Sequence, residues 1–188
     1  MILISAHSDT NFKHVALKSD GEHYTGHLDN FVGVYAVLKS YFSGEINFPY
    51  VRVELTYGEE TDFAGALEVA EEIEETDLVI VVDVTGTSTD KEFVIEKAGN
   101  PVVREFLSDV LKKFNYDIYE GCPDPISDLD EIEIYKSKSP YYLFLGIPCT
   151  GGDYNVVDVS CKKSSVEELS KALIQICRHY GKFQELVS

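Results

Sequence analysis

Short apolar runs alternate along the chain with longer stretches in which apolar residues recur every three or four positions. The short runs are rich in Val, Ile, Tyr and Phe, and such runs favour β-strands. They predict strands at residues 2–6, 51–56, 78–82, 91–97, 116–119 and 141–145. Residues 14–24 contain a Ser19-Asp20-Gly21 turn, which predicts a small hairpin or loop excursion.

The longer stretches have the spacing of amphipathic helices. They predict helices at residues 28–41, 63–75, 100–114, 127–135 and 166–183. Asn100-Pro101 suits the start of the helix at 100–114, because proline is tolerated in the first turn. Ser164 or Ser165 is expected to cap the last helix, which carries Glu167 and Glu168 in its first turn.

The order of these elements, in which strands alternate with helices, is typical of an α/β protein. The run at 78–82 is almost continuously β-branched and apolar, as expected for a strand covered on both faces. No internal repeat, low-complexity tract or linker interrupts the sequence. We therefore expect a single catalytic domain over residues 1–188, with three α/β/α layers and a mixed, largely parallel sheet.

The formal net charge is −17, and no cluster of Lys and Arg stands out. This charge argues against nucleic acid and an anionic membrane as partners, and it is compatible with attracting cations. The four cysteines lack CxxC spacing, no signal peptide precedes them, and the opening apolar run is too short to span a membrane. We expect reduced thiols and a cytoplasmic location.

Residues of metal-ligand type stand at the ends of the predicted strands and at the start of the first helix. In open α/β sheets, ligands bind at the carboxyl ends of strands. There the chain carries His7-Ser8-Asp9, Asp29-Asn30, Glu59-Glu60 and Asp83. A histidine and several carboxylates converging at one sheet edge suit a hydrolytic zinc or manganese site. His7 can ligate through one ring nitrogen while Asp9 fixes the ring, which gives Asp9 a supporting catalytic role.

Each of these residues also has an ordinary structural explanation. Glu59 and Glu60 could charge a helix N-terminus and favour its dipole. His7 could be a hydrogen-bonded histidine near a strand end, Asp29 a helix cap and Asp83 a strand terminator. The whole set, in this order, favours the metal site.

In this ordered set the sequence resembles the co-catalytic di-zinc exopeptidases, a family of aminopeptidases, related carboxypeptidases and deacylases. The likeness extends over essentially the whole chain. Its matching segments are Ile4-Ser5-Ala6-His7-Ser8-Asp9-Thr10, Leu28-Asp29-Asn30-Phe31-Val32-Gly33, Tyr57-Gly58-Glu59-Glu60 and Val81-Val82-Asp83. The resemblance implies a zinc-exopeptidase-like fold. It also implies a cis peptide bond between Asp29 and Asn30, which is rare outside proline.

The same resemblance implies a role for each matched residue. His7 and Asp83 would hold one metal ion, and Glu60 would hold the other. Asp29 would bridge the two ions, and Glu59 would be the general base. The cofactors would be two divalent metal ions, zinc first, with manganese or cobalt as alternatives.

Two features depart from the family pattern. The chain begins directly in the strand that carries His7, so the fold is expected to be truncated at its N-terminus. The family's last metal ligand is a histidine before the final helix, but residues 149–165 contain no histidine. Asp158 falls where that ligand would lie, and Asp153 is the alternative if the loop is shifted.

The expected function is a metal-dependent exopeptidase of aminopeptidase type that hydrolyses peptides or small amides. Only residues 8–28 separate the segments of His7 and Asp29, which matches the single-domain branch of the family. The alternative is a non-catalytic or regulatory homologue that keeps the fold, with or without one metal. Tyr154 is a weaker candidate for polarising an oxyanion, and His27 for lining the site. Relatives often assemble, so a homo-oligomer is also expected.

Overall fold

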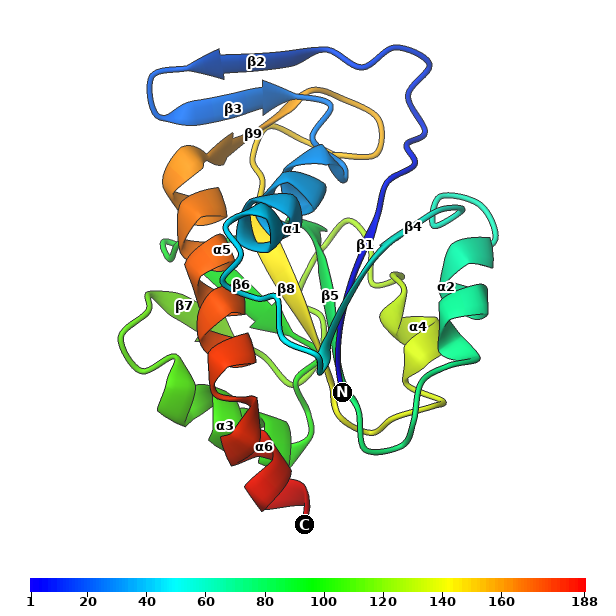
Figure 1. Cartoon of the computed structure of the whole chain (residues 1–188). Coiled ribbons are helices and arrows are strands. Elements are labelled where there is room, and N and C mark those ends of the chain that lie inside the picture. Colours follow the sequence, from blue (N-terminus) through cyan, green and yellow to red (C-terminus); the bar gives the residue numbers. More distant parts are fainter.

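The computed structural model describes residues 1–188, and its centre is a mixed sheet. The strand order is β4-β1-β5-β8-β6-β7. The strands are β4 (Val51–Thr56), β1 (Ile2–His7), β5 (Leu78–Thr85), β8 (Tyr142–Pro148), β6 (Phe93–Glu96) and β7 (Tyr116–Ile118). The first four are parallel to one another, β6 runs antiparallel to β8, and β7 is parallel to β6 (Figure 1). The predicted fold class is therefore confirmed.

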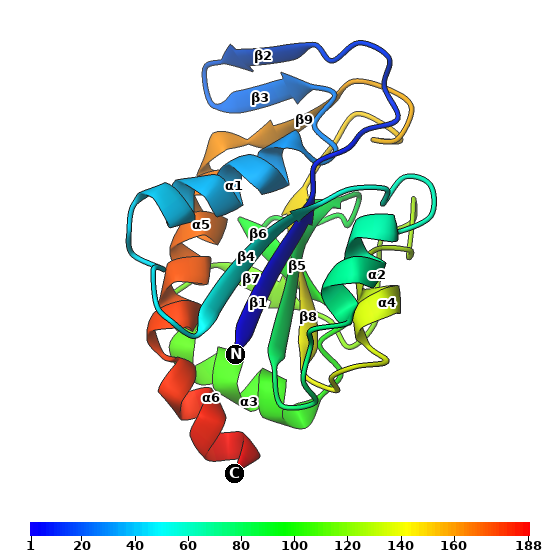
Figure 2. The ribbon, with the colours of Figure 1, turned by 45° about the vertical axis from the view of Figure 1, so that its right-hand side comes forward.

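Helices cover both faces of this sheet (Figure 2). One face carries α1 (Phe31–Phe42), α3 (Pro101–Val110), α5 (Lys163–Arg178) and α6 (Tyr180–Val187). The other face carries α2 (Ala64–Ala70) and the short α4 (Ile132–Tyr135). The buried apolar cluster has 35 residues on the first face and 9 on the second. The face covered by α2 and α4, which has the smaller apolar cluster, also holds the buried polar side chains of Ser5, His7 and Asp83 from the central strands.

Side-chain alternation along β1 and β5 decides which residues reach that face. Ile2, Ile4 and Ala6 belong to the large cluster, whereas Leu3 belongs to the small one. Successive side chains of a strand point to opposite faces, so Ser5 and His7 lie on the side of Leu3.

A second, small sheet has the order β2-β3-β9. Its strands are β2 (Leu17–Asp20), β3 (His23–Gly26) and β9 (Val159–Lys162). The hairpin of β2 and β3 agrees with the turn predicted at residues 19–21, whereas β9 was not predicted. Figure 1 shows this sheet above α1, over one end of the large sheet.

The last helix differs from its prediction in two ways. Its N-cap is Lys162, without a side-chain cap, so the expectation that Ser164 or Ser165 caps it is wrong. Both serines lie inside the first turn and turn their hydroxyls to the Glu92 carboxylate instead. The helix also breaks at His179, whose ring Nδ1 donates to the carbonyl of Gln175 at 2.9 Å while its backbone N–H bonds to Ile176. None of the helices combines the length and apolar character needed to cross a membrane.

Candidate metal centre

His7 and Asp83 meet at the carboxyl ends of two neighbouring parallel strands. His7 is the last residue of β1, and Asp83 lies near the end of β5. The His7 Nε2 atom is 3.1 Å from Asp83 Oδ2, and both residues are buried. The topology of the sheet therefore brings together two residues that are far apart in the sequence.

Asp29 approaches the same nitrogen from the loop between β3 and α1. Its Oδ1 atom is 3.1 Å from His7 Nε2. The Asp29–Asn30 peptide bond is cis, which confirms what the family resemblance implied. The Asn30 side chain donates to the carbonyl of Val82 at 2.8 Å. A Cβ on Gly33 would fall 2.0 Å from Asn30 Oδ1, so only glycine leaves room for this anchor.

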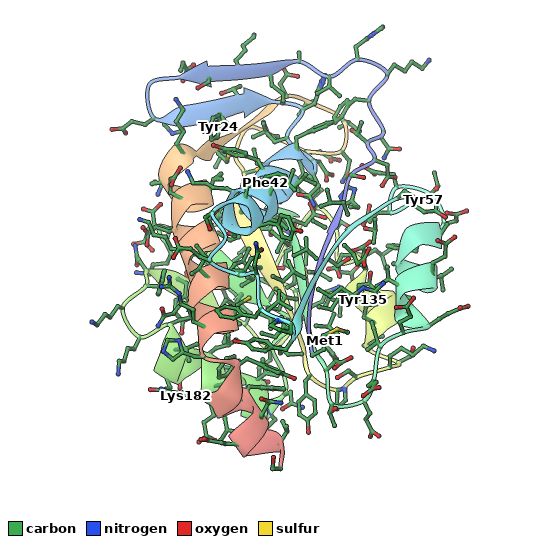
Figure 3. The ribbon with its side chains drawn as sticks, viewed as in Figure 1. Met1, Tyr24, Phe42, Tyr57, Tyr135 and Lys182 are labelled. Atoms are coloured by element: carbon green, nitrogen blue, oxygen red, sulfur yellow. The ribbon has the colours of Figure 1, made fainter.

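Glu59 and Glu60 reach the centre from a turn that follows β4. The turn begins at Tyr57, on the α2 side of the sheet (Figure 3), and Gly58 adopts a φ of 78°. The Asp9 carboxylate accepts from the backbone N–H groups of Glu59 and Glu60, both at 3.4 Å. One Glu59 carboxylate oxygen is 4.0 Å from His7 Nε2. The Glu60 carboxylate accepts a hydrogen bond from the amide of Asn11.

Two overlapping sets of donor atoms result from this convergence. His7, Asp29 and Asp83 form one set, and His7, Glu59 and Glu60 form the other. Within each set the candidate ligand atoms lie within 4.8 Å of one another. The five residues predicted from strand ends and from the start of the first helix are thus brought together, although their roles stay predictions.

Negative charge accumulates here without a compensating cationic side chain. No ion pair brings a Lys or Arg to these carboxylates. Burial, reinforced by the charge of Asp83, raises the pKa of Glu59 to about 9. Burial, with a further contribution from Asp29, raises the pKa of Asp83 to about 8 despite the opposing effect of His7. Burial and the charge of Asp29 also raise the pKa of Glu60.

The ring of His7 shows the same imbalance. Burial alone would lower its pKa, but the charge of Asp83 and hydrogen bonds to Asp29 and Asp83 raise it above the ordinary value. The other ring nitrogen, Nδ1, is buried without a hydrogen bond and lies 3.5 Å from Asp9 Oδ1. A divalent cation on Nε2 would offset the clustered carboxylate charge. It would also leave Nδ1–H free for Asp9, so the donor set fits a metal.

Asp158 and Asp153 are the two candidates for the last ligand, and the structure brings neither into these sets. Asp158 Oδ1 is 2.9 Å from His27 Nε2, and its side chain is 51% exposed. His27 stacks on Phe12 and accepts from the backbone N–H of Ala16, so it does not line the centre either. Asp153 accepts from the backbone N–H of Asn155 within its own loop.

A cavity of about 260 Å³ opens beside the two sets. Its wall includes Asp29, Glu59, Glu60 and Asp83, so it adjoins the metal-type donors directly. Tyr154 also lines it, and its hydroxyl donates to Asp124 at 2.8 Å.

The wall of this cavity also includes Glu96, from β6, and Cys122 and Asp124, from the loop after β7. Sequence reasoning did not single them out as site residues. Glu96 reads as one polar position in a strand and Asp124 as a loop residue between two prolines. No spacing rule connects them to the strand ends.

No protein-family model matches the sequence, and no curated protein matches it. The fold is similar to that of solved aminopeptidases at low sequence identity. The aminopeptidase APDkam598 from the archaeon Desulfurococcus kamchatkensis has a TM-score of 0.67 and 19% identity, covering 93% of this chain and 54% of that one.

Two further solved structures give the same result. For the TET aminopeptidase from the marine sediment archaeon Thaumarchaeota archaeon SCGC AB-539-E09, the TM-score is 0.67 at 14% identity, over 92% of this chain and 54% of that one. For the Pyrococcus horikoshii TET1 peptidase, the TM-score is 0.64 at 16% identity, over 88% of this chain and 53% of that one. The chain spans about half the length of these proteins, and the likeness establishes an aminopeptidase-like fold.

Proposed function

We propose that the protein is a metal-dependent exopeptidase of aminopeptidase type. The observation that carries this proposal is that the buried His7 is shared by two sets of donors, one with the buried Asp29 and Asp83 and one with the half-buried Glu59 and Glu60. The similarity of the fold to aminopeptidases supports it, because the donors lie at the strand ends where α/β proteins place their sites. The proposed substrates are peptides or small amides.

We propose two divalent ions as cofactors, zinc first, with manganese or cobalt as alternatives. His7 and Asp83 would hold one ion, Glu60 the other, and Asp29 would serve both. A bound pair of such ions polarises a carbonyl group and lowers the pKa of a water molecule towards neutrality. Asp9, 3.5 Å from His7 Nδ1, would orient the ring from behind.

Glu59 is the proposed general base. Its carboxylate lines the cavity. It lies 4.0 Å from His7 Nε2, farther than the carboxylates of Asp29 and Asp83, which are 3.1 Å away. It would take a proton from the attacking water and return it to the leaving amine. The surrounding carboxylates would also attract the free amino terminus of a substrate, which favours cleavage at chain ends.

The alternative, a non-catalytic homologue, is favoured by one specific observation. The loop before α5 supplies no ligand, since Asp158 is occupied with His27 and Asp153 with its own loop. Such a protein would bind a metal and hydrolyse nothing.

Metal content and hydrolysis, measured together, separate the two. The purified protein is expected to retain zinc or manganese after gel filtration and to hydrolyse some members of a panel of aminoacyl amides. A chelator should abolish this activity, and added metal should restore it. Asp83→Asn should lose metal, whereas Asp90→Asn, an exposed control, should keep it. Failure to bind either metal in excess would overturn the proposal, and binding without hydrolysis would favour the alternative.

We also propose that two copies of the chain associate through β2. The Pyrococcus horikoshii TET1 peptidase is described as assembling into a tetrahedron or a large octahedral shell. In this chain β2 is an exposed edge strand beside an apolar groove of about 390 Å³. Antiparallel pairing of two β2 strands about Ser19 would set Lys18 opposite Asp20. Sedimentation should show a dimer that Leu17→Asp dissociates, and a monomeric wild type would contradict it.

A further inference from the structure

The cavity beside the metal centre extends into a region that the proposed reaction does not use. Its wall also includes Glu96, which is 1% exposed, together with the half-buried Asp124 and Cys122. The Glu96 carboxylate accepts from the hydroxyls of Thr85 and Thr87 at 2.8 and 2.7 Å, and from the Cys122 thiol at 3.1 Å. Burial and this hydrogen bond raise the pKa of Cys122 to about 12, so the thiol remains a neutral donor.

Asp124 is held in the same manner. One of its oxygens accepts from the backbone N–H of Gly86 and from the hydroxyl of Tyr154, both at 2.8 Å, and lies 3.1 Å from the Thr85 hydroxyl, whose single hydrogen is shared with Glu96. The other accepts from the backbone N–H of Ile126. Each of these donors is neutral.

The charge of these two carboxylates is therefore uncompensated. Asp130, another acid in the wall, has its own cation, because Lys97 Nζ lies 2.9 Å from its Oδ2. Glu96 and Asp124 have no such partner, and no Lys, Arg or His lines the cavity. A buried carboxylate without a cation is costly, so this end of the cavity attracts a positive group.

The rest of the wall is suited to an aliphatic chain. Phe63, Leu129 and Phe144 also line the cavity. A long side chain with an apolar stem and a cationic head matches this arrangement, because Lys and Arg bury their methylene groups beside apolar surface. A short or acidic side chain would leave the apolar wall or the two carboxylates unmatched.

We propose that this cavity binds the basic side chain, Lys or Arg, of the residue at the amino terminus of the substrate. The inference rests on the proposed peptidase function, which places the scissile bond beside His7. Its acceptors are Glu96 and Asp124, and its apolar wall includes the aromatic rings of Phe63 and Phe144.

Binding and hydrolysis test this proposal with a matched pair of ligands. L-lysinamide and L-norleucinamide have side chains of similar length, and only lysinamide carries the terminal ammonium. Calorimetry on zinc-loaded Glu59→Gln, which is expected to keep the metal without hydrolysing the amides, should show lysinamide binding about tenfold or more tightly, as expected for a charged hydrogen bond. With the wild-type protein, a lysyl anilide should likewise exceed a norleucyl anilide in kcat/KM.

Glu96→Gln tests the source of the preference. The glutamine oxygen can still accept from Thr85 and Thr87, and its amide can face the Cys122 sulfur, so the fold should be kept. The ratio of lysinamide to norleucinamide affinity, measured in the same Glu59→Gln background, should fall by about tenfold. Glu105→Gln removes one charge from the exposed surface of α3 and should leave that ratio unchanged.

The possible outcomes distinguish a failure of the basic subsite from a failure of the proposed peptidase function on which it rests. Equal affinity for the two amides, or an unchanged ratio in Glu96→Gln, would overturn the basic subsite even if both anilides are hydrolysed. A ratio that falls equally in Glu105→Gln would also overturn it, because the preference would then come from overall charge. If lysinamide binds selectively but no anilide is hydrolysed, the subsite stands and the peptidase function fails.

Discussion

Glu59 differs from the other acids of the centre in the contacts of its carboxylate. The Asp29 and Asp83 carboxylates contact His7, and the Glu60 carboxylate accepts from Asn11, whereas the structure gives the Glu59 carboxylate no hydrogen bond. A carboxylate that is near the centre and not committed to a partner is free to exchange a proton.

Glu59→Gln should therefore lower kcat by about a hundredfold or more, because general acid–base catalysis contributes on that order. The amide has the same shape, so metal stoichiometry should stay that of the wild type. Steady-state kinetics on an aminoacyl amide and metal analysis of the same sample check both parts. Glu71→Gln, an exposed change on the α2 side, is the matched control. Unchanged turnover would refute the role of Glu59.

Single residues were predictable where chain topology alone places them. His7 and Asp83 follow from the rule that parallel strand ends share one edge of the sheet, and Asp29 was found at the start of the first helix. That rule does not predict Glu96, because β6 runs antiparallel to β8. The Glu96 carboxylate joins the site through its hydrogen bond from Thr85 of β5. The rule also cannot place Asp158, since the side-chain pairing with His27 depends on a loop conformation that spacing does not encode.

At the scale of elements, Glu131 joins three of them behind the metal centre. It precedes α4, and its carboxylate accepts from Ser5 of β1 at 2.6 Å and from Thr56 of β4. Thr56 is the register partner of His7. Tyr135 of α4, labelled in Figure 3, has its hydroxyl 3.0 Å from that of Ser5. This buried network supports the ends of the two strands that carry the site.

Burial raises the pKa of Glu131, with Ser5 and Thr56 opposing. A carboxyl group with a raised folded-state pKa holds its proton longer than in the unfolded chain. Its contribution to stability therefore falls as pH rises above the ordinary value of about 4.3. Glu131→Gln cannot ionise, so its melting temperature relative to wild type should improve from pH 5 to pH 8.

Glu131→Ala is the matched comparison for the same network. It leaves the Ser5 and Thr56 hydroxyls buried and unpaired, and should lose about 2–3 kcal/mol of unfolding free energy at either pH. Thermal melts of wild type, Glu131→Gln and Glu131→Ala at pH 5 and pH 8 test both expectations. If Gln were as destabilising as Ala at pH 8, the carboxylate charge itself would be the stabilising feature.

Element types were predictable from periodicity, whereas several boundaries were not. The helix predicted at 63–75 is only Ala64–Ala70, because Phe63 takes a left-handed φ of 58° and the chain turns after Glu71. The helix predicted at 166–183 divides at His179, where a side chain competes for a backbone carbonyl. Strand β9 is four residues long and exists through its pairing with β3, a contact between distant segments.

At the scale of the whole molecule, the chain is strongly acidic, with a net charge of −17, and four of its carboxylates meet at one centre without a Lys or Arg partner. Without metal, protons take the place of the cation there. Glu59 and Asp83 have folded pKa values of about 9 and about 8, against about 4 in an unfolded chain. The folded metal-free protein thus binds more protons than the unfolded chain between about pH 4 and 9. Its unfolding free energy should fall as pH rises through that window.

His7 adds to the same trend, because its raised pKa keeps a proton that the unfolded chain loses above about pH 6.5. Metal binding displaces these protons, so it strengthens as pH rises. At a free metal concentration one hundred times Kd, the stabilisation is about 2.7 kcal/mol, or roughly 5–10 °C in Tm for a chain of this size.

Zinc or manganese should therefore raise Tm by more at pH 8 than at pH 5.5, and chelated protein should melt lower at pH 8. Asp83→Asn removes one proton-binding group and one ligand together, so both the pH slope and the metal shift should shrink. Differential scanning calorimetry of wild type and of Asp83→Asn, each at both pH values and with chelator or metal, measures the pH dependence of Tm and the metal-induced shift in Tm for each protein. Equal metal shifts at the two pH values would mean that the cation binds somewhere other than this centre, because only a site that exchanges protons for metal couples the two.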